Sequence, residues 1–264
     1  MKITVGVHLP AQNGDYGRLK DAWMEADDLG ADYIYTSDHF FPPSFDPEVT
    51  KEALYGKTLE ATSIQAAMAA TTHRAQIGCL VHSNSFRNPN LLADIARTID
   101  LISGGRFVLG IGSGWYQLDY DEYGYDFGTA GSRLRDLERD LPIIKARMAR
   151  LNPPPTRHIP ILIGGGGEKM TLKLAAQYAD TWHFFGEPEV LKRKSEILDD
   201  WCAQVGRDPK EIVRSTSVGN LFGREFKPDD YIKIGYTDFL TMAMGPDWNL
   251  ASLRDLLAWR KASS

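Results

Sequence analysis

The chain has 264 residues, of which 43% are hydrophobic and 25% are charged, and its formal net charge is −5. This composition is typical of a globular protein and excludes collagen-like, coiled-coil and disordered chains. The acidic balance, without a basic cluster, argues against nucleic acid or an anionic membrane surface as a partner.

The two cysteines, Cys79 and Cys202, are too few for a disulfide framework or a structural zinc site. Polar residues interrupt the first eight positions, so they lack the apolar core of a signal peptide. No stretch reaches the roughly 20 apolar residues that span a bilayer. We therefore expect a cytoplasmic location.

Short β-branched runs alternate with amphipathic segments along the whole chain. The predicted strands are 3–9, 33–37, 76–82, 107–112, 159–164, 181–185, 212–219 and 237–244. The predicted helices are 18–29, 58–70, 90–102, 133–151, 169–178, 188–205, 228–234 and 252–261.

Eight strand-then-helix units without a change of composition predict a single (β/α)8 barrel, a TIM barrel, over residues 1–264. A doubly wound sheet also alternates, but eight units in this length favour a closed barrel. Since barrel enzymes carry their chemistry in the loops after the strands, the residues there are the candidates for function.

An acidic residue and a histidine, Asp38 and His39, follow the second predicted strand. They can deliver a carboxylate and a titratable imidazole to one ligand. The alternative is that Asp38 caps a turn and His39 is solvated. Their place at a strand end favours a function.

The segments after the third and fourth strands also suggest a ligand. Residues 78–89 mix apolar side chains with hydrogen-bond donors, although Leu80 and Val81 can equally be the end of a buried strand. Residues 110–116 contain three glycines, which allow a ligand to approach the backbone. Trp115 stands where a dinucleotide fingerprint needs glycine, so that motif is excluded. Trp115 and Tyr116 either stack on a ligand or cover the barrel mouth.

Four glycines, residues 164–167, follow the fifth strand and precede a helix. A glycine run at a helix start offers free N–H groups to an anion, so we expect a phosphate there rather than a merely flexible turn. Arg87, Arg133 and Arg135 are candidates to reach an anionic group, although arginines on helices are mostly solvated.

Four histidines, at positions 8, 39, 82 and 183, lie near strand ends and raise the question of a metal. The sequence contains no His-x-His pair, and Asp238 falls near the start of the last strand rather than its end. We therefore predict no metal site.

Together these motifs, in this order, resemble the luciferase-like oxidoreductase superfamily that includes bacterial luciferase, in the branch that uses the deazaflavin coenzyme F420. The resemblance covers about residues 3–214, and FMN-dependent members share most of its motifs. The matching segments are 36–40, 80–81, 87–89, 100–106, 110–115, 159–168 and 179–182.

The resemblance implies roles for particular residues. His39 would be catalytic, as the proton donor beside the reactive face of the ring, and Asp38 would bind the ring's polar edge. Leu80 and Val81 would hold a non-prolyl cis peptide behind the ring. The remaining predicted cofactor-binding residues line the ring, the ribityl chain or the phosphate: Ser113, Gly114, Trp115, Gly165, Gly166 and Gly167.

Two departures from the family pattern matter. Sugar-phosphate dehydrogenases of this group have Trp shortly after the Asp-His pair and Glu after the strand-four glycines. Here these places hold Pro43 or Ser44, and Trp115, which argues against glucose-6-phosphate as the substrate. The insertion before the fifth strand is shortened to residues 152–158, which should open one side of the mouth.

The sequence therefore predicts an F420-dependent oxidoreductase that transfers hydride to or from a small carbonyl, alcohol, imine or activated alkene. The alternatives are an FMN-dependent monooxygenase of the same fold, a metal-dependent hydrolase and a non-catalytic cofactor-binding protein. The resemblance also implies a homodimer, packed across the second and third helices through small residues at 61, 66, 67, 69 and 70.

Overall fold

A closed ring of parallel strands forms the centre of this computed structural model, which describes residues 2–44, 51–218 and 227–263. The strand order is β3-β2-β1-β9-β8-β7-β6-β5-β4, and a pairing of β3 with β5 closes the ring. The strands are β1 (Thr4–His8), β2 (Tyr33–Thr36), β3 (Gln76–Cys79), β4 (His82–Ser83), β5 (Phe107–Gly112), β6 (Ile161–Gly164), β7 (Thr181–His183), β8 (Val213–Ser217) and β9 (Asp238–Met242).

Strands β3 and β4 are two parts of one barrel strand. Both pair with β5, in the registers Ile77↔Phe107 and His82↔Ile111. The cis peptide bond between Leu80 and Val81 separates them. The barrel therefore has eight strands, and all its pairings are parallel.

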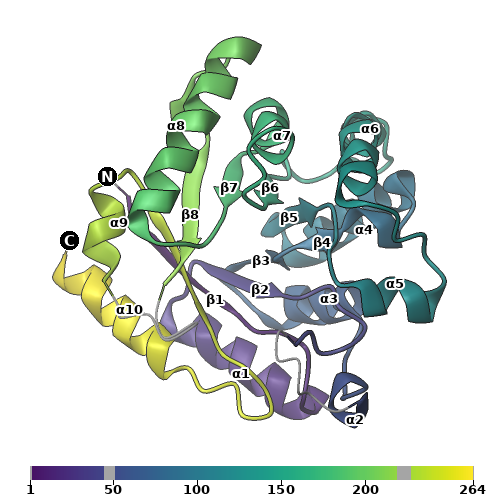
Figure 1. Ribbon diagram of the computed structural model, residues 1–264. Helices are drawn as coiled ribbons and strands as arrows, with labels where there is room; N and C mark the ends of the chain where they lie inside the picture. Colours follow the sequence, from purple (N-terminus) through teal and green to yellow (C-terminus); the bar gives the residue numbers. More distant parts are fainter. Residues whose placement is uncertain (1, 45–50, 219–226, 264) are drawn as a thin grey trace.

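Helices surround this barrel on the outside (Figure 1). Their ends carry the expected signals: Asp15 caps the first helix, and Gly30 ends it in the left-handed conformation. The α-helices are α1 (Tyr16–Leu29), α2 (Lys51–Leu54), α3 (Ala61–Thr71), α4 (Pro89–Ser103), α5 (Gln117–Tyr123), α6 (Ala130–Met148), α7 (Thr171–Tyr178), α8 (Pro188–Val205), α9 (Pro228–Ile232) and α10 (Ala251–Ala262), with short 3₁₀ turns at Asn84–Phe86 and Pro209–Glu211.

The predicted TIM barrel is confirmed, and every predicted strand and helix is present to within a few residues. Two details differ. The predicted strand 76–82 is broken at the cis peptide, and helices α2 and α5 were not predicted. Residue 219 of the predicted strand 212–219 lies outside the described residues. Helix α5 is a short helix in the loop after β5, where the glycines and aromatic residues had indicated only a loop.

Apolar side chains fill the space on both sides of the barrel wall. Outward-facing strand residues pack against the helices in one large buried cluster, with Trp23, Phe107, Trp182 and Phe239 among its largest members. A small separate cluster fills the barrel interior: Tyr35, Val108, Leu162 and Leu240, with Tyr33, Leu80 and Val81 packed against it. Side chains therefore fill the barrel interior below the carboxyl ends of the strands. A ligand can enter only at the mouth, which the carboxyl ends form.

Among the helices that the structure describes, none is long and apolar enough to cross a membrane.

Candidate active site

The His39 imidazole lies at the barrel mouth and is held by Asp119, a residue that the sequence analysis missed. His39 Nδ1 is 2.7 Å from Asp119 Oδ2. The other carboxylate oxygen accepts the backbone N–H groups of Phe40 at 2.9 Å and Phe41 at 3.1 Å. The Asp119 side chain is 1% exposed, whereas that of His39 is 19% exposed. His39 is therefore fixed through one nitrogen and partly open to solvent.

Two aromatic side chains from the loop after β5 stand beside His39. The rings of Trp115 and Tyr116 lie edge-on to the imidazole, with centroids 5.6 Å and 5.7 Å away. Trp115 is 47% exposed. An exposed tryptophan beside a partly exposed histidine gives this side of the mouth an apolar wall with one polar group in it.

The predicted non-prolyl cis peptide at Leu80–Val81 is present. The Val81 side chain packs where barrel-wall side chains would otherwise stand, because a Cβ atom on Gly112 or Gly164 would come within 2.8 Å or 2.9 Å of it. These two glycines thus make room for Val81, which forms an apolar platform on the opposite side of the ring of strands from β8.

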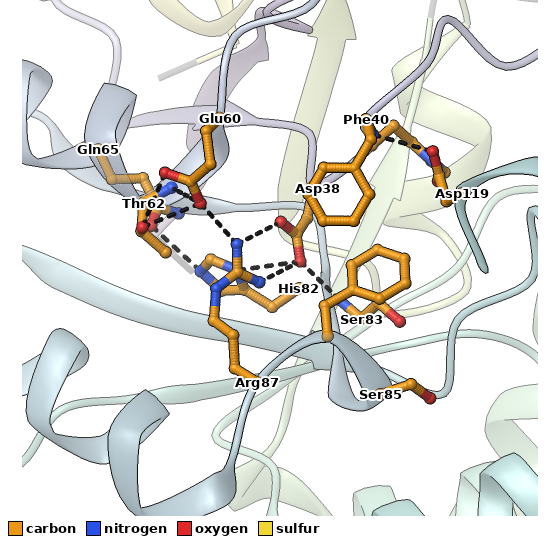
Figure 2. A network of polar contacts seen from close by, with 12 residues as sticks. Asp38, Phe40, Glu60, Thr62, Gln65, His82, Ser83, Ser85, Arg87 and Asp119 are labelled. Atoms are coloured by element: carbon orange, nitrogen blue, oxygen red, sulfur yellow. Dashed lines mark hydrogen bonds and ion pairs between the residues drawn. The ribbon is translucent and has the colours of Figure 1, made fainter. Parts of the chain in front are cut away.

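Asp38 lies in a network of polar contacts with Arg87, His82 and Ser83 (Figure 2). Arg87 binds both of its oxygens, at 2.7 Å and 2.8 Å, and the Ser83 N–H donates to Oδ2 at 3.0 Å. His82 Nδ1 is 3.4 Å from the same oxygen. Burial alone would raise the pKa of Asp38, but His82 and Arg87 outweigh it and hold that pKa well below its usual range.

The carboxylate of Asp38 is therefore occupied by protein donors. Its predicted direct contact with a ring stays a prediction. Because Asp38 directly precedes His39, the bonds to Asp38 fix the start of the loop that carries the histidine.

Arg87 is committed to this network and is not free to reach an anionic ligand. Its side chain is 10% exposed and also binds Glu60 at 2.7 Å, so it lies between two carboxylates (Figure 2). Burial opposes ionisation of Glu60, but the N–H groups of Ser63 and Thr62 and the Arg87 guanidinium lower its pKa to about 2.

The other two candidate arginines differ from each other. Arg133 lies over the Phe127 ring and donates to the carbonyls of Gly114 and Phe127, whereas Arg135 is exposed. Arg133 is therefore a structural support of the loop after β5.

Ser113 and Gly114 stand at the start of that loop. The Ser113 carbonyl lies 3.4 Å from the Tyr120 hydroxyl, and Gly114 has φ +77°. A Cβ atom on Gly114 would collide with that hydroxyl and with Ser83 Oγ. Glycine is therefore required for the chain to pass this point and carry Trp115 to the mouth.

Protein donors bind the backbone carbonyls of the glycine tetrad and of the residue that follows it. Four successive carbonyls each accept a hydrogen bond from the protein: Gly165 from Trp182 Nε1 (2.8 Å), Gly166 from Lys194 Nζ (2.5 Å), Gly167 from Leu172 N (3.0 Å) and Glu168 from Trp201 Nε1 (2.8 Å). In a trans peptide the next N–H points opposite to the carbonyl. The N–H groups of residues 166–169 are thus directed away from these donors, an arrangement that suits an anion.

Two details of the tetrad differ from expectation. Helix α7 begins at Thr171, so a turn through residues 168–170 separates the glycines from the helix. The Gly165 N–H donates to the His183 carbonyl at 3.1 Å, so this one glycine N–H is already used.

Two other histidines, His8 and His183, lie at the carboxyl ends of β1 and β7 and contact Ser37 and Ser215. Burial and the charge of His39 lower the pKa of His8 to about 4, and burial together with His8 lowers that of His183 to about 3. Both are therefore neutral at pH 7. Within residues 2–44, 51–218 and 227–263, no group of three or more His, Cys, Asp or Glu side chains is placed to hold a metal ion. As predicted, Asp238 begins its strand.

Fold and site together define a TIM barrel whose mouth carries a partly exposed histidine, the Val81 platform and the glycine turn. A family model of luciferase-like monooxygenases matches residues 1–219. The chain therefore belongs to the luciferase-like monooxygenase family, and the resemblance seen in the motifs is confirmed.

Individual relatives cover most of the chain. An uncharacterized protein of Mycobacterium tuberculosis is 30% identical over 235 residues, covering 81% of this chain and 80% of its own. An F420-dependent glucose-6-phosphate dehydrogenase of Microbacterium testaceum is 27% identical over 234 residues, covering 80% and 67%. Among solved structures, an F420-dependent secondary alcohol dehydrogenase in complex with an F420–acetone adduct has a TM-score of 0.80 at 15% identity, with 98% of both chains covered. That identity shows a shared fold alone.

Proposed function

We propose that this chain is an F420-dependent oxidoreductase that moves a hydride between the deazaflavin and a small organic substrate: a carbonyl or alcohol, an imine or an activated alkene. The observation that carries this proposal is the His39–Asp119 pair, which places a fixed, partly exposed imidazole at the mouth beside the apolar Val81 platform. The F420-dependent relative supports the choice of coenzyme.

The residues present fit a tricyclic cofactor that carries a phosphate. Gly112 and Gly164 leave room for the Val81 platform, on which a flat ring can rest. The N–H groups of Gly166 and Gly167 each point away from the donor that binds the preceding carbonyl. A phosphate can therefore accept hydrogen bonds from them. Ser113, Gly114 and Trp115 complete the proposed cofactor site beside the Val81 platform and the glycine turn. We assign to Asp38 the role of supporting the loop that carries His39.

When bound, F420 supplies a ring carbon that gives or accepts a hydride. The protein's own part is to orient the reactants and to move one proton. Asp119 accepts the Nδ1–H of His39, which leaves Nε2 as the nitrogen that exchanges a proton with the substrate oxygen or nitrogen. Trp115 and Tyr116 shield this nitrogen from part of the solvent.

We do not assign glucose-6-phosphate as the substrate. A cation is the usual partner of the phosphate group of a sugar phosphate, and the candidate arginines Arg87 and Arg133 are both engaged within the protein. The exposed indole of Trp115 instead favours a less polar substrate.

The alternative function is an FMN-dependent monooxygenase, which the description of the matching family favours. Such an enzyme would consume oxygen and require a reductase, and it would use the same platform and phosphate turn.

Fluorescence titration with F420 and FMN in parallel tests the proposal. Micromolar or tighter binding of F420, with weak binding of FMN, supports it, and reduced F420 should then turn over with small carbonyl compounds. Preference for FMN moves the assignment to the monooxygenase. Binding of neither overturns both.

We also propose a homodimer across α3 and α4. Leu91, Leu101 and Ile102 are exposed apolar residues on α4. On the neighbouring α3, Ala70 is exposed and Ala66 and Ala67 are half-buried, so these small residues permit close helix packing, whereas Ala61 and Ala69 are buried within the protomer. Sedimentation of the purified protein checks this.

A further inference from the structure

The carboxyl end of β8 faces the Val81 platform across the barrel mouth. In the closed ring, three strands separate β8 from the strand of β3 and β4 in either direction, so the two lie opposite each other. Ser217, at the end of β8, pairs with Leu240, a member of the cluster that fills the barrel interior. Because paired residues of parallel strands point to the same side, the Ser217 side chain points into the barrel.

A hydrogen-bonded chain of four side chains ends at Ser217. Asp238 accepts the Thr4 hydroxyl at 2.6 Å and is hydrogen-bonded to Ser215. Ser215 Oγ lies 2.8 Å from His183 Nδ1, and His183 Nε2 lies 3.3 Å from Ser217 Oγ. Asp238, Ser215 and His183 are buried, whereas Ser217 is half-buried. Ser217 is therefore the member of the chain that can reach a ligand.

The carboxylate at the buried end gives this chain a direction, because a carboxylate only accepts hydrogen bonds. Burial raises the pKa of Asp238 to about 6, which leaves it mainly ionised at pH 7, so Ser215 donates to it. Ser215 Oγ then accepts the Nδ1–H of His183, and the bare Nε2 of this neutral imidazole accepts the Ser217 hydroxyl. If Ser217 turned away, the buried Nε2 would lose its donor. Toward a ligand, Ser217 therefore acts as an acceptor.

The neighbouring pair, His8 and Ser37, has the same polarity. Burial keeps His8 neutral, and the Thr36 carbonyl accepts its one N–H, so Nε2 accepts the Ser37 hydroxyl at 2.9 Å. His8 also interacts electrostatically with His39 on one side and with His183 on the other. The acceptor at the end of β8 and the proton-exchanging histidine are therefore on separate parts of the mouth, with His8 between them.

We propose that Ser217 accepts a hydrogen bond from the substrate, and that the substrate is a carbonyl compound with a separate hydroxyl group, or the corresponding diol. This inference rests on the proposed function and names its substrate class. A substrate held between a ring on the Val81 platform and β8 places its reactive oxygen at His39 and its hydroxyl at Ser217. Asp238 acts only through Ser215 and His183, as a positioning residue that keeps Ser217 an acceptor.

A hydroxyl group suits this wall better than the alternatives. An ether or a second carbonyl in the same place brings only acceptors to an acceptor, so it loses its hydrogen bonds to water without replacement. An ammonium group could donate, but burial keeps His8 and His183 neutral, and a neutral wall offers a charge little compensation for lost water.

Hydroxyacetone and 4-hydroxy-2-butanone, each compared with its methyl ether, test this inference. Calorimetry measures the binding of each ketone to protein loaded with oxidised F420, which cannot reduce it, and kcat/KM is measured with reduced F420. The variants are Ser217→Ala and Asp238→Asn. Thr216→Val is the matched control, because Thr216 pairs with Phe239 of the outer cluster and so faces the helices.

We expect the wild type to favour the hydroxyketone over its ether roughly 5–10-fold in at least one pair, the effect of about one hydrogen bond. Ser217→Ala should lose this preference. Asp238→Asn should reduce it, because an amide can donate to Ser215 as well as accept from it and no longer fixes the direction of the chain. Thr216→Val should keep it. The size difference between ketone and ether is the same in every variant, so a changed preference reports the hydrogen bond.

The absence of a preference in both pairs, or a preference that survives Ser217→Ala, overturns this inference while the proposed function stands. An equal loss in Thr216→Val overturns it as well. A preference that Ser217→Ala removes but Asp238→Asn leaves unchanged overturns the positioning role of Asp238. If the wild type binds F420 but none of the ketones, the inference fails alone. If it does not bind F420, the proposed function fails, and this inference fails with it.

Discussion

His39 Nδ1 lies 2.7 Å from Asp119 Oδ2, and this contact joins two loops that are 80 residues apart in the chain. The remaining oxygen of Asp119 accepts two backbone N–H groups from the His39 loop, so the carboxylate fixes both the imidazole and the backbone that carries it. A buried carboxylate in this position selects the tautomer with the proton on Nδ1. The proton-exchanging nitrogen is therefore Nε2.

Asp119→Asn should lower the turnover of the loaded enzyme strongly. The two N–H groups of Phe40 and Phe41 will retain the amide oxygen, so the amide NH₂ will face His39 and force its proton onto Nε2. We expect a loss of roughly 10²-fold or more in kcat, with the F420 affinity changed by less than about threefold. Asp121→Asn, on an exposed position of the same helix, is the control. Equal kcat in the two variants would contradict the positioning role.

His39→Ala should reduce kcat far more than coenzyme affinity. Since Asp119 acts through His39, the double variant His39→Ala/Asp119→Asn should be no slower than His39→Ala alone. Steady-state kinetics of the four proteins in this cycle measure the coupling. Additive losses would show that Asp119 acts independently of the histidine.

The barrel was predictable from the sequence because its signal is repeated eight times. Each strand is a short β-branched run followed by an amphipathic helix, and an error in one boundary does not change the fold. The cis peptide at Leu80–Val81 was expected from the family resemblance, since nothing in the local residue types indicates a cis bond.

The partners of the site residues were not predictable in the same way. Asp119 stands in an acidic stretch with Asp121 and Glu122, and only the packing of α5 against the mouth distinguishes it. The position of Asp38 after a barrel strand predicts a ligand-binding group. Its closure by Arg87 and His82 depends on contacts between three loops, which spacing along the chain does not reveal.

Removing the guanidinium from the Asp38 network should destabilise the protein. Arg87→Gln leaves a carboxylate that is almost fully buried with only Ser83 N–H and His82 near it. We expect the free energy of unfolding to fall by roughly 3–5 kcal/mol. Adding Asp38→Asn should restore part of it, because the buried charge is then gone. Arg18→Gln, which breaks the exposed pair with Asp247, should cost less than about 1 kcal/mol. Urea denaturation measures all four proteins, and equal losses for the two arginines would refute this account.

Acid should destabilise the fold through the two buried histidines of the mouth. In the unfolded chain a histidine has a pKa near 6.5, whereas burial lowers the pKa of His8 to about 4 and that of His183 to about 3. Between these values the unfolded state binds protons that the folded state does not, so stability is complete above pH about 6.5 and decreases as the pH falls toward about 4. Asp238, with its pKa raised to about 6, takes up a proton in the folded state first and offsets part of this loss.

The net decrease between pH 7 and pH 5 should be on the order of 2 kcal/mol. His8→Asn cannot be protonated in this range, so it should flatten the pH dependence, even where its stability at pH 7 is lower. Urea denaturation at the two pH values gives the difference for each protein, and His73→Asn, on an exposed residue, is the control. A pH dependence as steep in His8→Asn as in the wild type would mean that folding does not lower the pKa of His8, and this account would be wrong.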